Sequence, residues 1–198
     1  AKGKEVELLK ESKEVQDPSI PLIVVPTTAG SGSEATHFAV VYIGTDKYSL
    51  AANCLIPNAI ILDGSLTFSG SKYQKTCNAL DAMAQAIESA WATQSTDESI
   101  KYSMESIELG WGVMNNFIKP SCSSVEAQKM IEASNLAGRA INISKTTSAH
   151  AWSYAFTSFF DIPHGHAIWL TLPAIFELHS KAEPNNFIDK RGKKHISS

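Results

Sequence analysis

Several features that would direct the sequence towards a particular class of protein are missing from its 198 residues. No apolar run exceeds a few residues, so no transmembrane helix is expected, and no basic segment followed by an apolar one indicates a signal peptide. The charges are balanced, with 17 Lys and Arg against 20 Asp and Glu, which argues against a broad basic face for nucleic acid. We therefore expect neither a membrane nor a nucleic-acid partner.

Cysteine is scarce as well. The three cysteines, Cys54, Cys77 and Cys122, are widely spaced, and no two of them form a CxxC pair. This pattern favours reduced thiols in a cytoplasmic protein over a disulfide framework. Apolar residues, in contrast, make up 43% of the sequence and charged residues only 19%, which allows a sizeable core and excludes wholesale disorder.

The first third of the sequence predicts short strands. Residues 1–20 place a few apolar side chains among charges, which indicates a surface helix. LIVVP (22–26) is a continuous apolar run rich in β-branched residues, which predicts a strand covered on both faces. Residues 37–44 and 58–63 are two further strand candidates, with a turn at 44–47. A strand-rich piece of this size cannot easily build its own core, so we interpret it as the end of a larger α/β unit.

After about residue 70 the apolar spacing becomes helical, and glycine and proline become rare. In the first of these segments Leu80, Met83, Ile87 and Trp91 share one stripe. The second opens with a Ser/Thr-x-x-Glu pattern, which predicts a capping box. The sequence therefore predicts an all-helical domain, followed by a polar tail, with helices over 72–94, 95–118, 123–143, 150–160 and 166–180.

A loop of small residues, PTTAGSGSE (26–34), directly follows the first predicted strand. Its two glycines allow the backbone to approach a ligand closely, and its hydroxyl and N–H groups suit phosphate or ribose oxygens. The loop is neither a GxGxxG motif nor a P-loop. A tight strand-to-helix connection would have the same composition, so both interpretations stay open.

Four residues in the helical part could hold a metal ion. Asp81 and Gln85 are four apart on a predicted helix and share a face. His150 opens another helix, and His164 lies fourteen residues later in the turn IPHGH. One carboxylate with two imidazoles suits Fe²⁺ or Zn²⁺, and a lone Asp in an apolar stripe is costly without a partner. The alternative is an Asp and two histidines that are satisfied by hydrogen bonds within the protein.

Three segments, PTTAGSGSEAT, LDAMAQAIES and SAHAWSYAFTSFFDIPHGHA, occur in this order and together resemble the iron-type (group III) alcohol dehydrogenases. The resemblance implies an α/β dinucleotide-binding domain, of which 1–68 would be the C-terminal part, followed by a helical metal-binding domain over 69–198, here truncated. It places the active site in the cleft between the two domains. It also implies a homo-oligomer, most simply a dimer.

The same resemblance implies roles for individual residues. Asp81, His150 and His164 correspond to metal ligands of the family, with Fe²⁺ the first expectation and Zn²⁺ the second. Gln85 stands where many members have a further histidine ligand, and Tyr154 where many have a second histidine. Tyr154, bound water or a cofactor hydroxyl would deliver the proton. The positions that match contacts to NAD(H) or NADP(H) are Thr27, Thr28, Gly30, Ser31, Lys47, Leu66 and Thr67.

The sequence has about half the length typical of this family, and the glycine-rich segment that cradles the cofactor pyrophosphate is not found in residues 1–25. We therefore expect a fragment of a family member, which by itself would bind the nicotinamide cofactor weakly. A non-catalytic interaction piece is the corresponding alternative.

Lys145 precedes the ligand candidate His150 by five residues, and a lysine so close to a metal ion needs a counter-charge. A substrate with a phosphonate, phosphate or carboxylate group would supply it. NISKTTSAH and the glutamine of LDAMAQAIES most resemble the phosphonoacetaldehyde reductases of the family, which implies reduction of a small anionic aldehyde.

Three alternatives stay open beside the anionic aldehyde. Lys145 could instead extend into solvent or bind a cofactor phosphate, and the substrate could be a neutral short-chain alcohol. The dehydroquinate-synthase-like relatives share the metal site, but they need more basic residues than Lys145 and Arg139 supply.

Overall fold

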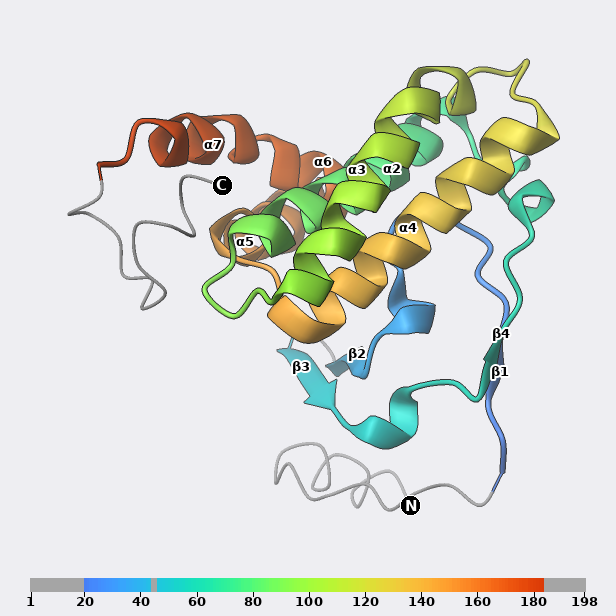
Figure 1. The fold of residues 1–198 in the computed structure, drawn as a ribbon, viewed down its shortest axis with the longest axis horizontal. Helices are drawn as coiled ribbons and strands as arrows, with labels where there is room; N and C mark the ends of the chain where they lie inside the picture. The colour runs from blue at the N-terminus through green and yellow to red at the C-terminus, as the bar shows by residue number, and fades with distance from the viewer. Residues whose placement is uncertain (1–19, 44–45, 184–198) are drawn as a thin grey trace.

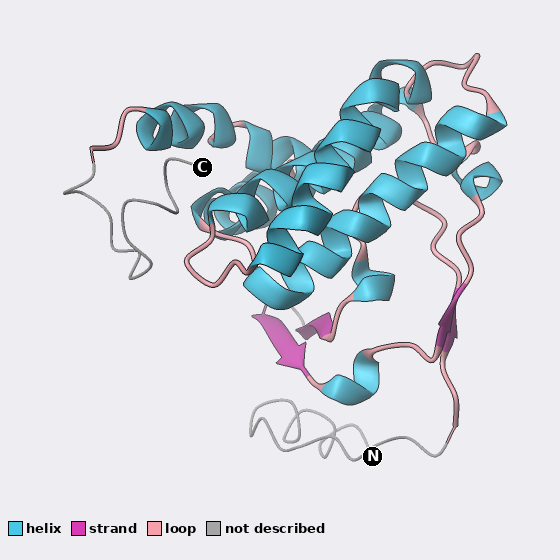
Figure 2. Ribbon diagram, viewed as in Figure 1, coloured by secondary structure: helices cyan, strands magenta, loops and turns pink. Residues whose placement is uncertain are grey.

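The computed structural model describes residues 20–43 and 46–183, and for residues 42, 43, 46 and 47 it describes the backbone alone. Two short pairs of strands precede a block of helices (Figures 1 and 2). This arrangement confirms the predicted fold class, a short α/β part followed by a helical domain. The surface helix expected in 1–20 and most of the polar tail lie outside the described residues.

The strands form two separate two-stranded sheets. β1 (Ile23–Val24) pairs in parallel with β4 (Ala59–Ile60), and β2 (Phe38–Ile43) pairs with β3 (Asp46–Ala51) as an antiparallel hairpin. Three 3₁₀ turns lie between or after the strands, η1 (Ser33–Ala35), η2 (Asn53–Leu55) and η3 (Gly64–Thr67). All three predicted strands are present, although the first and third are reduced to two residues each.

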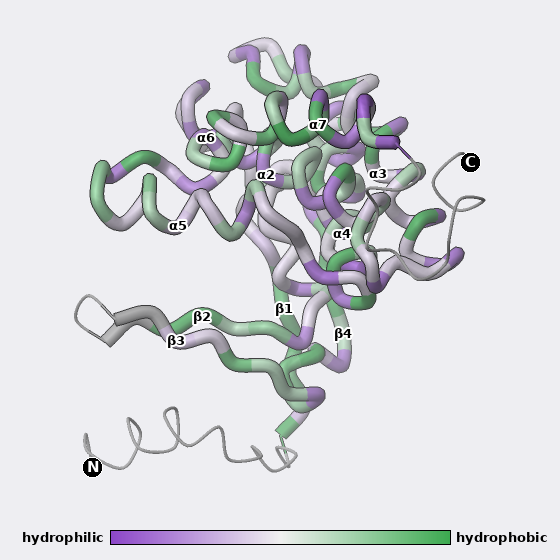
Figure 3. The backbone as a smooth tube through the Cα atoms, turned by 90° about the vertical axis from the view of Figure 1, so that its left-hand side faces the viewer, coloured by the Kyte–Doolittle hydropathy of each residue, from purple (hydrophilic) through white to green (hydrophobic). Residues whose placement is uncertain are grey.

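The expectation that the first strand is covered on both faces is wrong for the described part of the chain. Ile23 is 60% exposed and Val25 42% exposed, because β4 is the one described strand beside β1 and no described helix makes an extensive contact with it. Figure 3 shows β1 and β4 as hydrophobic segments at the edge of the helical block.

Three long helices, α2 (Lys72–Trp91), α3 (Asp97–Phe117) and α4 (Ser124–Ser144), pack side by side (Figure 1). α5 (Ser148–Phe160) and α6 (His164–Trp169) pack against each other, α6 also contacts α2, and α7 (Leu172–Ser180) follows. Among the described helices, none is long and apolar enough to cross a membrane. The core between α2, α3 and α4 is formed by Ala79, Ala82, Met83, Val113, Phe117, Met130, Ile131 and Ala133.

Reciprocal side-chain and backbone hydrogen bonds define where the long helices begin. α3 does begin with a capping box, but its members are Thr96 and Ser99 rather than the predicted Ser95 and Glu98. Ser99, at the third helical position, accepts a hydrogen bond from the backbone N–H of Thr96. The box therefore forms one residue later than the Ser/Thr-x-x-Glu pattern indicated. Ser71 with Gln74 and Ser123 with Glu126 form the boxes of α2 and α4.

The last predicted helix is divided in two. α6 ends at Trp169 and α7 begins at Leu172 with Pro173 in its first turn, where the missing N–H of proline costs no helical hydrogen bond. α6 also begins earlier than predicted, so that His164 is its first residue rather than part of a turn. This start directs His164 back towards α5, which ends at Phe160.

Candidate functional site

Asp81, His150 and His164 lie together although they come from three different helices. One potential ligand atom from each lies within 4.8 Å of the other two. Asp81 is 8% exposed and His150 4% exposed, and His150 Nε2 lies 3.4 Å from Asp81 Oδ1. The structure therefore brings together the three side chains that the sequence suggested as metal ligands.

A buried carboxylate on α2, Glu88, fixes the orientation of His150. Its Oε2 is hydrogen bonded to His150 Nδ1. Its Oε1 accepts from the backbone N–H groups of Thr147 at 3.2 Å and Ala149 at 3.0 Å, and from the Thr147 hydroxyl. Because Nδ1 donates to Glu88, the other ring nitrogen, Nε2, faces Asp81 as a potential ligand atom.

Sequence reasoning missed Glu88. The available signal was its spacing, because Glu88 follows Asp81 by seven residues and therefore lies two turns further along the same face of α2. The side chain of Glu88 is completely buried.

Ser153 performs a similar task for His164. Its hydroxyl donates to the carbonyl oxygen of His150 at 2.6 Å and lies 3.1 Å from His164 Nδ1. Since the serine hydrogen is used in the first bond, the serine oxygen accepts from Nδ1–H of His164. This sets the tautomer that keeps the lone pair of His164 on Nε2, as ligation through Nε2 requires.

The electrostatics of this cluster favour positive charge. Burial lowers the pKa of His150, but the neighbouring carboxylates of Asp81 and Glu88, the second of which is hydrogen bonded to Nδ1, outweigh it and raise the pKa to about 9. Burial likewise raises the pKa of Glu88, but hydrogen bonds from His150, Thr147 and Ala149 bring it below its ordinary value. The same carboxylates that favour a proton on His150 would attract a divalent cation.

Two buried acceptor atoms at this point have no hydrogen-bond partner, Gln85 Oε1 and His150 Nε2. Both belong to side chains that contact Asp81, and Gln85 Nε2 donates to Asp81 Oδ1 at 3.3 Å. Buried polar atoms without partners are rare in proteins. A cation that accepts oxygen and nitrogen ligands would satisfy both, so the residues present fit a divalent metal ion such as Fe²⁺ or Zn²⁺.

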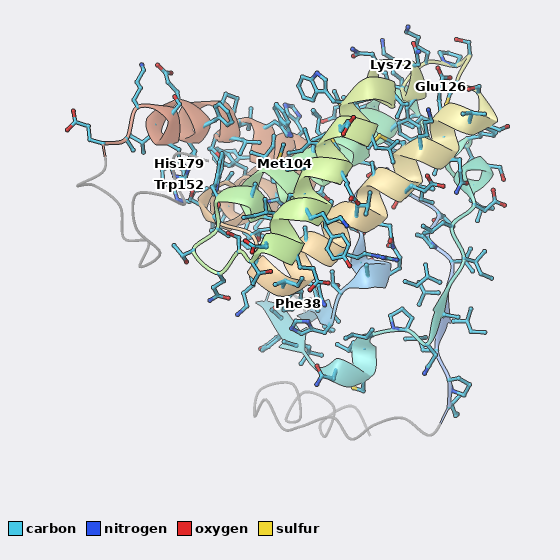
Figure 4. The ribbon with its side chains drawn as sticks, viewed as in Figure 1. Phe38, Lys72, Met104, Glu126, Trp152 and His179 are labelled. Carbon is cyan, nitrogen blue, oxygen red and sulfur yellow. The ribbon has the colours of Figure 1, made fainter. Side chains whose placement is uncertain are left out.

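A first cavity of about 690 Å³ opens beside the cluster. It is enclosed by the ends of α4 and α5, by the loop after β1 and by the β2–β3 hairpin, which includes Phe38 (Figure 4). Tyr154 borders it, and its ring stacks on His164 with centroids 5.9 Å apart and planes 7° apart. The predicted site residues in its lining are Ser31, Gln85, Lys145, His150 and Tyr154.

Lys145 ends α4 in an uncommon backbone conformation. Its φ of 64° lies in the region that only glycine adopts without cost, and its side chain is exposed at the first cavity. This sharp turn allows α5 to begin three residues later, so that Ser148 to His150 follow α4 directly into the metal cluster.

A second cavity, of about 440 Å³, is bordered by Thr27, Thr28, Leu66 and Thr67. The residues predicted to contact the cofactor therefore lie at two different cavities, because Ser31 borders the first one. Gly30 is not among the lining residues of either cavity. It packs on α2, where an added Cβ would lie 2.8 Å from Asn78 Cα. Lys47 pairs with Tyr42 in the hairpin, and its side chain lies outside the described part. The role of these positions in cofactor binding stays a prediction.

The loop between the two cavities is fixed to α4 by a close contact of two glycines. Gly32 has a φ of 56°, and a Cβ on Gly138 would lie 2.2 Å from the carbonyl oxygen of Gly32. Asn135 Nδ2 donates to the buried carboxylate of Glu34 at 3.0 Å. The loop is therefore a tightly packed connection that also borders both cavities, and its contact with a ligand stays a prediction.

Comparison with known families agrees with this site. Residues 2–64 match the family described as iron-containing alcohol dehydrogenase, and residues 76–193 match the C-terminal part of the Fe-containing alcohol dehydrogenase family. The protein therefore belongs to the iron-containing alcohol dehydrogenases, as the three sequence segments implied.

Individual relatives are about 30% identical to the chain in sequence. Phosphonoacetaldehyde reductase of Streptomyces viridochromogenes is 30% identical over 181 residues, which are 90% of this chain and 46% of the relative. The probable alcohol dehydrogenase EutG of Escherichia coli is 29% identical over 83% of this chain and 42% of its own length.

Among solved structures, sulfoacetaldehyde reductase from Bifidobacterium kashiwanohense in complex with NAD⁺ is similar to the chain, with a TM-score of 0.85 and 29% identity. The match covers 90% of this chain and 48% of that structure. The chain thus spans about half the length of the relatives that it matches.

Proposed function

We propose that the protein acts as a metal-dependent, NAD(P)H-linked alcohol dehydrogenase or aldehyde reductase. The observation that carries this proposal is the convergence of Asp81, His150 and His164 beside two buried acceptor atoms without partners. Membership of a family named for iron supports Fe²⁺ as the ion, with Zn²⁺ second. NAD⁺ in the related sulfoacetaldehyde reductase structure supports a nicotinamide cofactor.

When bound, the metal would supply Lewis-acid stabilisation of the alcohol or aldehyde oxygen, and the cofactor would exchange hydride with the carbonyl carbon. The protein's own residues bind the metal ion and orient its ligands. Asp81, His150 and His164 would hold the ion, and Gln85 would offer its amide oxygen as a fourth ligand. Glu88 and Ser153 keep the two imidazoles in the tautomers that this requires.

Tyr154 is the residue best placed to hold a proton for the reaction. Its ring is stacked on His164, and the side chain borders the first cavity, where it is 41% exposed. We propose that its hydroxyl donates the proton that aldehyde reduction consumes, directly or through water. Its stacked ring also covers one face of a metal ligand and limits access of bulk water there.

For the substrate, we propose a small anionic aldehyde such as phosphonoacetaldehyde, which would be reduced to 2-hydroxyethylphosphonate. Lys145 is the one Lys or Arg among the residues that line the first cavity. The carboxylate in that lining, Glu34, is buried and accepts from Asn135, and among the described residues no ion pair joins it to Lys145. The names of two related reductases specify acetaldehydes with a phosphonate or a sulfonate group.

Elemental analysis of the purified protein, combined with titration of NADH and NADPH and a screen of charged and neutral aldehydes, tests the proposal. Bound iron or zinc, cofactor affinity and reduction of an anionic aldehyde are the expected results. Reduction of neutral aldehydes alone would favour the general alcohol dehydrogenase. The absence of both metal and cofactor binding would contradict the proposal. It would favour the alternative that the chain is a non-catalytic interaction piece. A homodimer stays a prediction that size-exclusion chromatography with light scattering can check.

A further inference from the structure

The indole N–H of Trp91 is directed at the segment that carries His150. Trp91 is the last residue of α2, where its place in the apolar stripe accounts for packing alone. The structure adds a hydrogen bond, because Nε1 of Trp91 donates to the hydroxyl oxygen of Thr147 at 3.0 Å. α7 packs against the half-buried ring, with the ring centroids of Phe176 and His179 at 5.8 and 4.6 Å from the indole (Figure 4). The ring is therefore held with its N–H towards the start of α5.

Thr147 precedes the first residue of α5, at the position where a threonine side chain ordinarily caps a helix. Within the described part of the chain its hydroxyl makes no capping hydrogen bond. The carboxylate of Glu88 on α2 caps α5 instead, since it accepts from the backbone N–H groups of Thr147 and Ala149. The hydroxyl of Thr147 is released from its usual local task, and it donates to the same carboxylate oxygen, Oε1 of Glu88.

The hydrogen bonds between Trp91 and His150 have directions that the chemistry of the groups dictates. An indole N–H can only donate, so the oxygen of Thr147 must accept from Trp91. A threonine hydroxyl has a single hydrogen, which goes to Glu88. An ionised carboxylate can only accept, so its second oxygen, Oε2, takes Nδ1–H of His150. Each bond thus favours the tautomer of His150 in which Nε2 faces Asp81 as a ligand atom.

The orientation of the Glu88 carboxylate depends on these donors, because the side chain is completely buried and water cannot replace them. Oε1 receives two backbone N–H groups and the Thr147 hydroxyl, which leaves Oε2 for His150. Hydrogen bonds in a protein interior polarise one another, so the bond from Trp91 strengthens the donation from Thr147 to Glu88. Trp91 therefore acts on His150 through two intervening side chains.

We propose that Trp91 and Thr147 are positioning residues of the metal site. Their hydrogen bonds hold the Glu88 carboxylate, and through it His150, in the orientation that metal binding requires. The inference rests on the proposed function in taking Asp81, His150 and His164 as metal ligands. It also works in the opposite direction, because a cation beside Nε2 of His150 changes the charge on the imidazole and so the polarisation of every bond back to the indole.

The first test measures the affinity for Zn²⁺ in competition with a chromophoric chelator. Thr147→Val removes the hydroxyl and keeps the branched shape, and Trp91→Phe removes the N–H and keeps an aromatic ring. Each should weaken Zn²⁺ binding by about 3- to 10-fold, as for one lost hydrogen bond. Thr147→Ser keeps the hydroxyl and should stay within about twofold of the unaltered protein. The matched controls are Thr93→Val and Trp111→Phe, at two exposed positions, and they should leave the affinity unchanged.

A measurement on the unaltered protein covers the case in which a variant does not fold. In a ¹⁵N–¹H correlation spectrum each tryptophan gives a separate indole N–H signal. We expect the signal of Trp91 to move when Zn²⁺ binds and that of the exposed Trp111 to stay in place. In Thr147→Val the signal of Trp91 should no longer respond to Zn²⁺, whereas in Thr147→Ser it should respond as in the unaltered protein. A residue that contributed only to folding would not produce this difference.

Three results would overturn the inference. They are unchanged Zn²⁺ affinities in both Thr147→Val and Trp91→Phe, an affinity of Thr147→Ser as low as that of Thr147→Val, and a Trp91 signal that does not move when Zn²⁺ binds. No Zn²⁺ binding by the unaltered protein would contradict both this inference and the proposed function.

The two otherwise fail separately. A protein that binds Zn²⁺ equally well in every variant retains the metal site and loses this inference. A protein in which Zn²⁺ moves the Trp91 signal, but which neither binds the cofactor nor reduces an aldehyde, keeps this inference and loses the proposed function.

Discussion

Glu88 and His150 connect α2, which also carries Asp81, to the start of α5. One carboxylate oxygen of Glu88 is bonded to Nδ1 of His150, and the other accepts from backbone N–H groups at the start of α5. The same buried side chain therefore determines both where α5 begins and how the imidazole is turned. A carboxylate, a histidine and a metal in this order form a recurrent arrangement in metal sites.

Replacing Glu88 by Gln should weaken metal binding more than it weakens the fold. The amide keeps an oxygen for the N–H groups of Thr147 and Ala149 but loses the negative charge beside His150. We expect the affinity for Co²⁺, followed by its visible absorption, to fall by about 10- to 100-fold. Glu108→Gln, an exposed change on α3, is the control and should leave the affinity unchanged. Equal affinities for all three proteins would show that Glu88 has no part in the site.

The contact between Gly32 and Gly138 should be intolerant of a single methyl group. A Cβ at Gly138 would lie 2.2 Å from the Gly32 carbonyl oxygen, so Gly138→Ala has to separate the loop from α4. We expect it to lower the free energy of unfolding by about 1–3 kcal/mol or more, measured by urea denaturation. Gly112→Ala is the matched control, since no atom lies within 4 Å of an added Cβ there. It should raise the free energy of unfolding by about 0.5–1 kcal/mol, and a similar effect of the two changes would refute the close contact.

Lys145 should distinguish charged from neutral substrates. Lys145→Ala removes the one Lys or Arg of the first cavity, so KM for phosphonoacetaldehyde should rise by about 10-fold or more. KM for a neutral aldehyde such as propionaldehyde should change by less than about twofold, and Lys145→Arg should restore most of the difference. The exposed Lys101 on α3 provides the control substitution, Lys101→Ala. An equal rise for charged and neutral aldehydes would remove the anion-binding role of Lys145.

The capping box of α4 should make stability depend on acid pH. Hydrogen bonds from the backbone and side chain of Ser123 hold the pKa of Glu126 below its ordinary value of 4.5. A lowered pKa in the folded state means that the stabilisation is complete above the ordinary pKa and is lost as the pH falls through the folded pKa. The melting temperature should therefore fall more steeply below pH 4.5 in the unaltered protein than in Glu126→Gln, which cannot ionise. Parallel curves for the two proteins would contradict this linkage.

Much of the fold could be predicted from local patterns. The stripe that contains Met83 and the Ser/Thr-x-x-Glu pattern before α3 indicated two of the long helices, because such signals act within one or two turns. The break before α7 was missed because an apolar run continues through Pro173, and the exposure of Ile23 was missed because burial of a strand depends on neighbours that are distant in the sequence.

The candidate site divides in the same way. Asp81, His150 and His164 were indicated by ligand chemistry and by family resemblance, but their proximity depends on the packing of α5 and α6 against each other and of α6 against α2. Glu88 was missed because glutamate in a helical sequence is usually solvated, and only the tertiary structure shows that it is buried.

Metal binding by matched variants tests the central claim most directly. The purified protein, stripped with a chelator and titrated with Fe²⁺ under anaerobic conditions or with Zn²⁺, should bind one ion per chain. Asp81→Ala, His150→Ala and His164→Ala should each lose this binding, whereas His179→Ala on α7 should retain it. Stoichiometric binding that survives all three ligand substitutions, or no binding by the unaltered protein, would contradict the account.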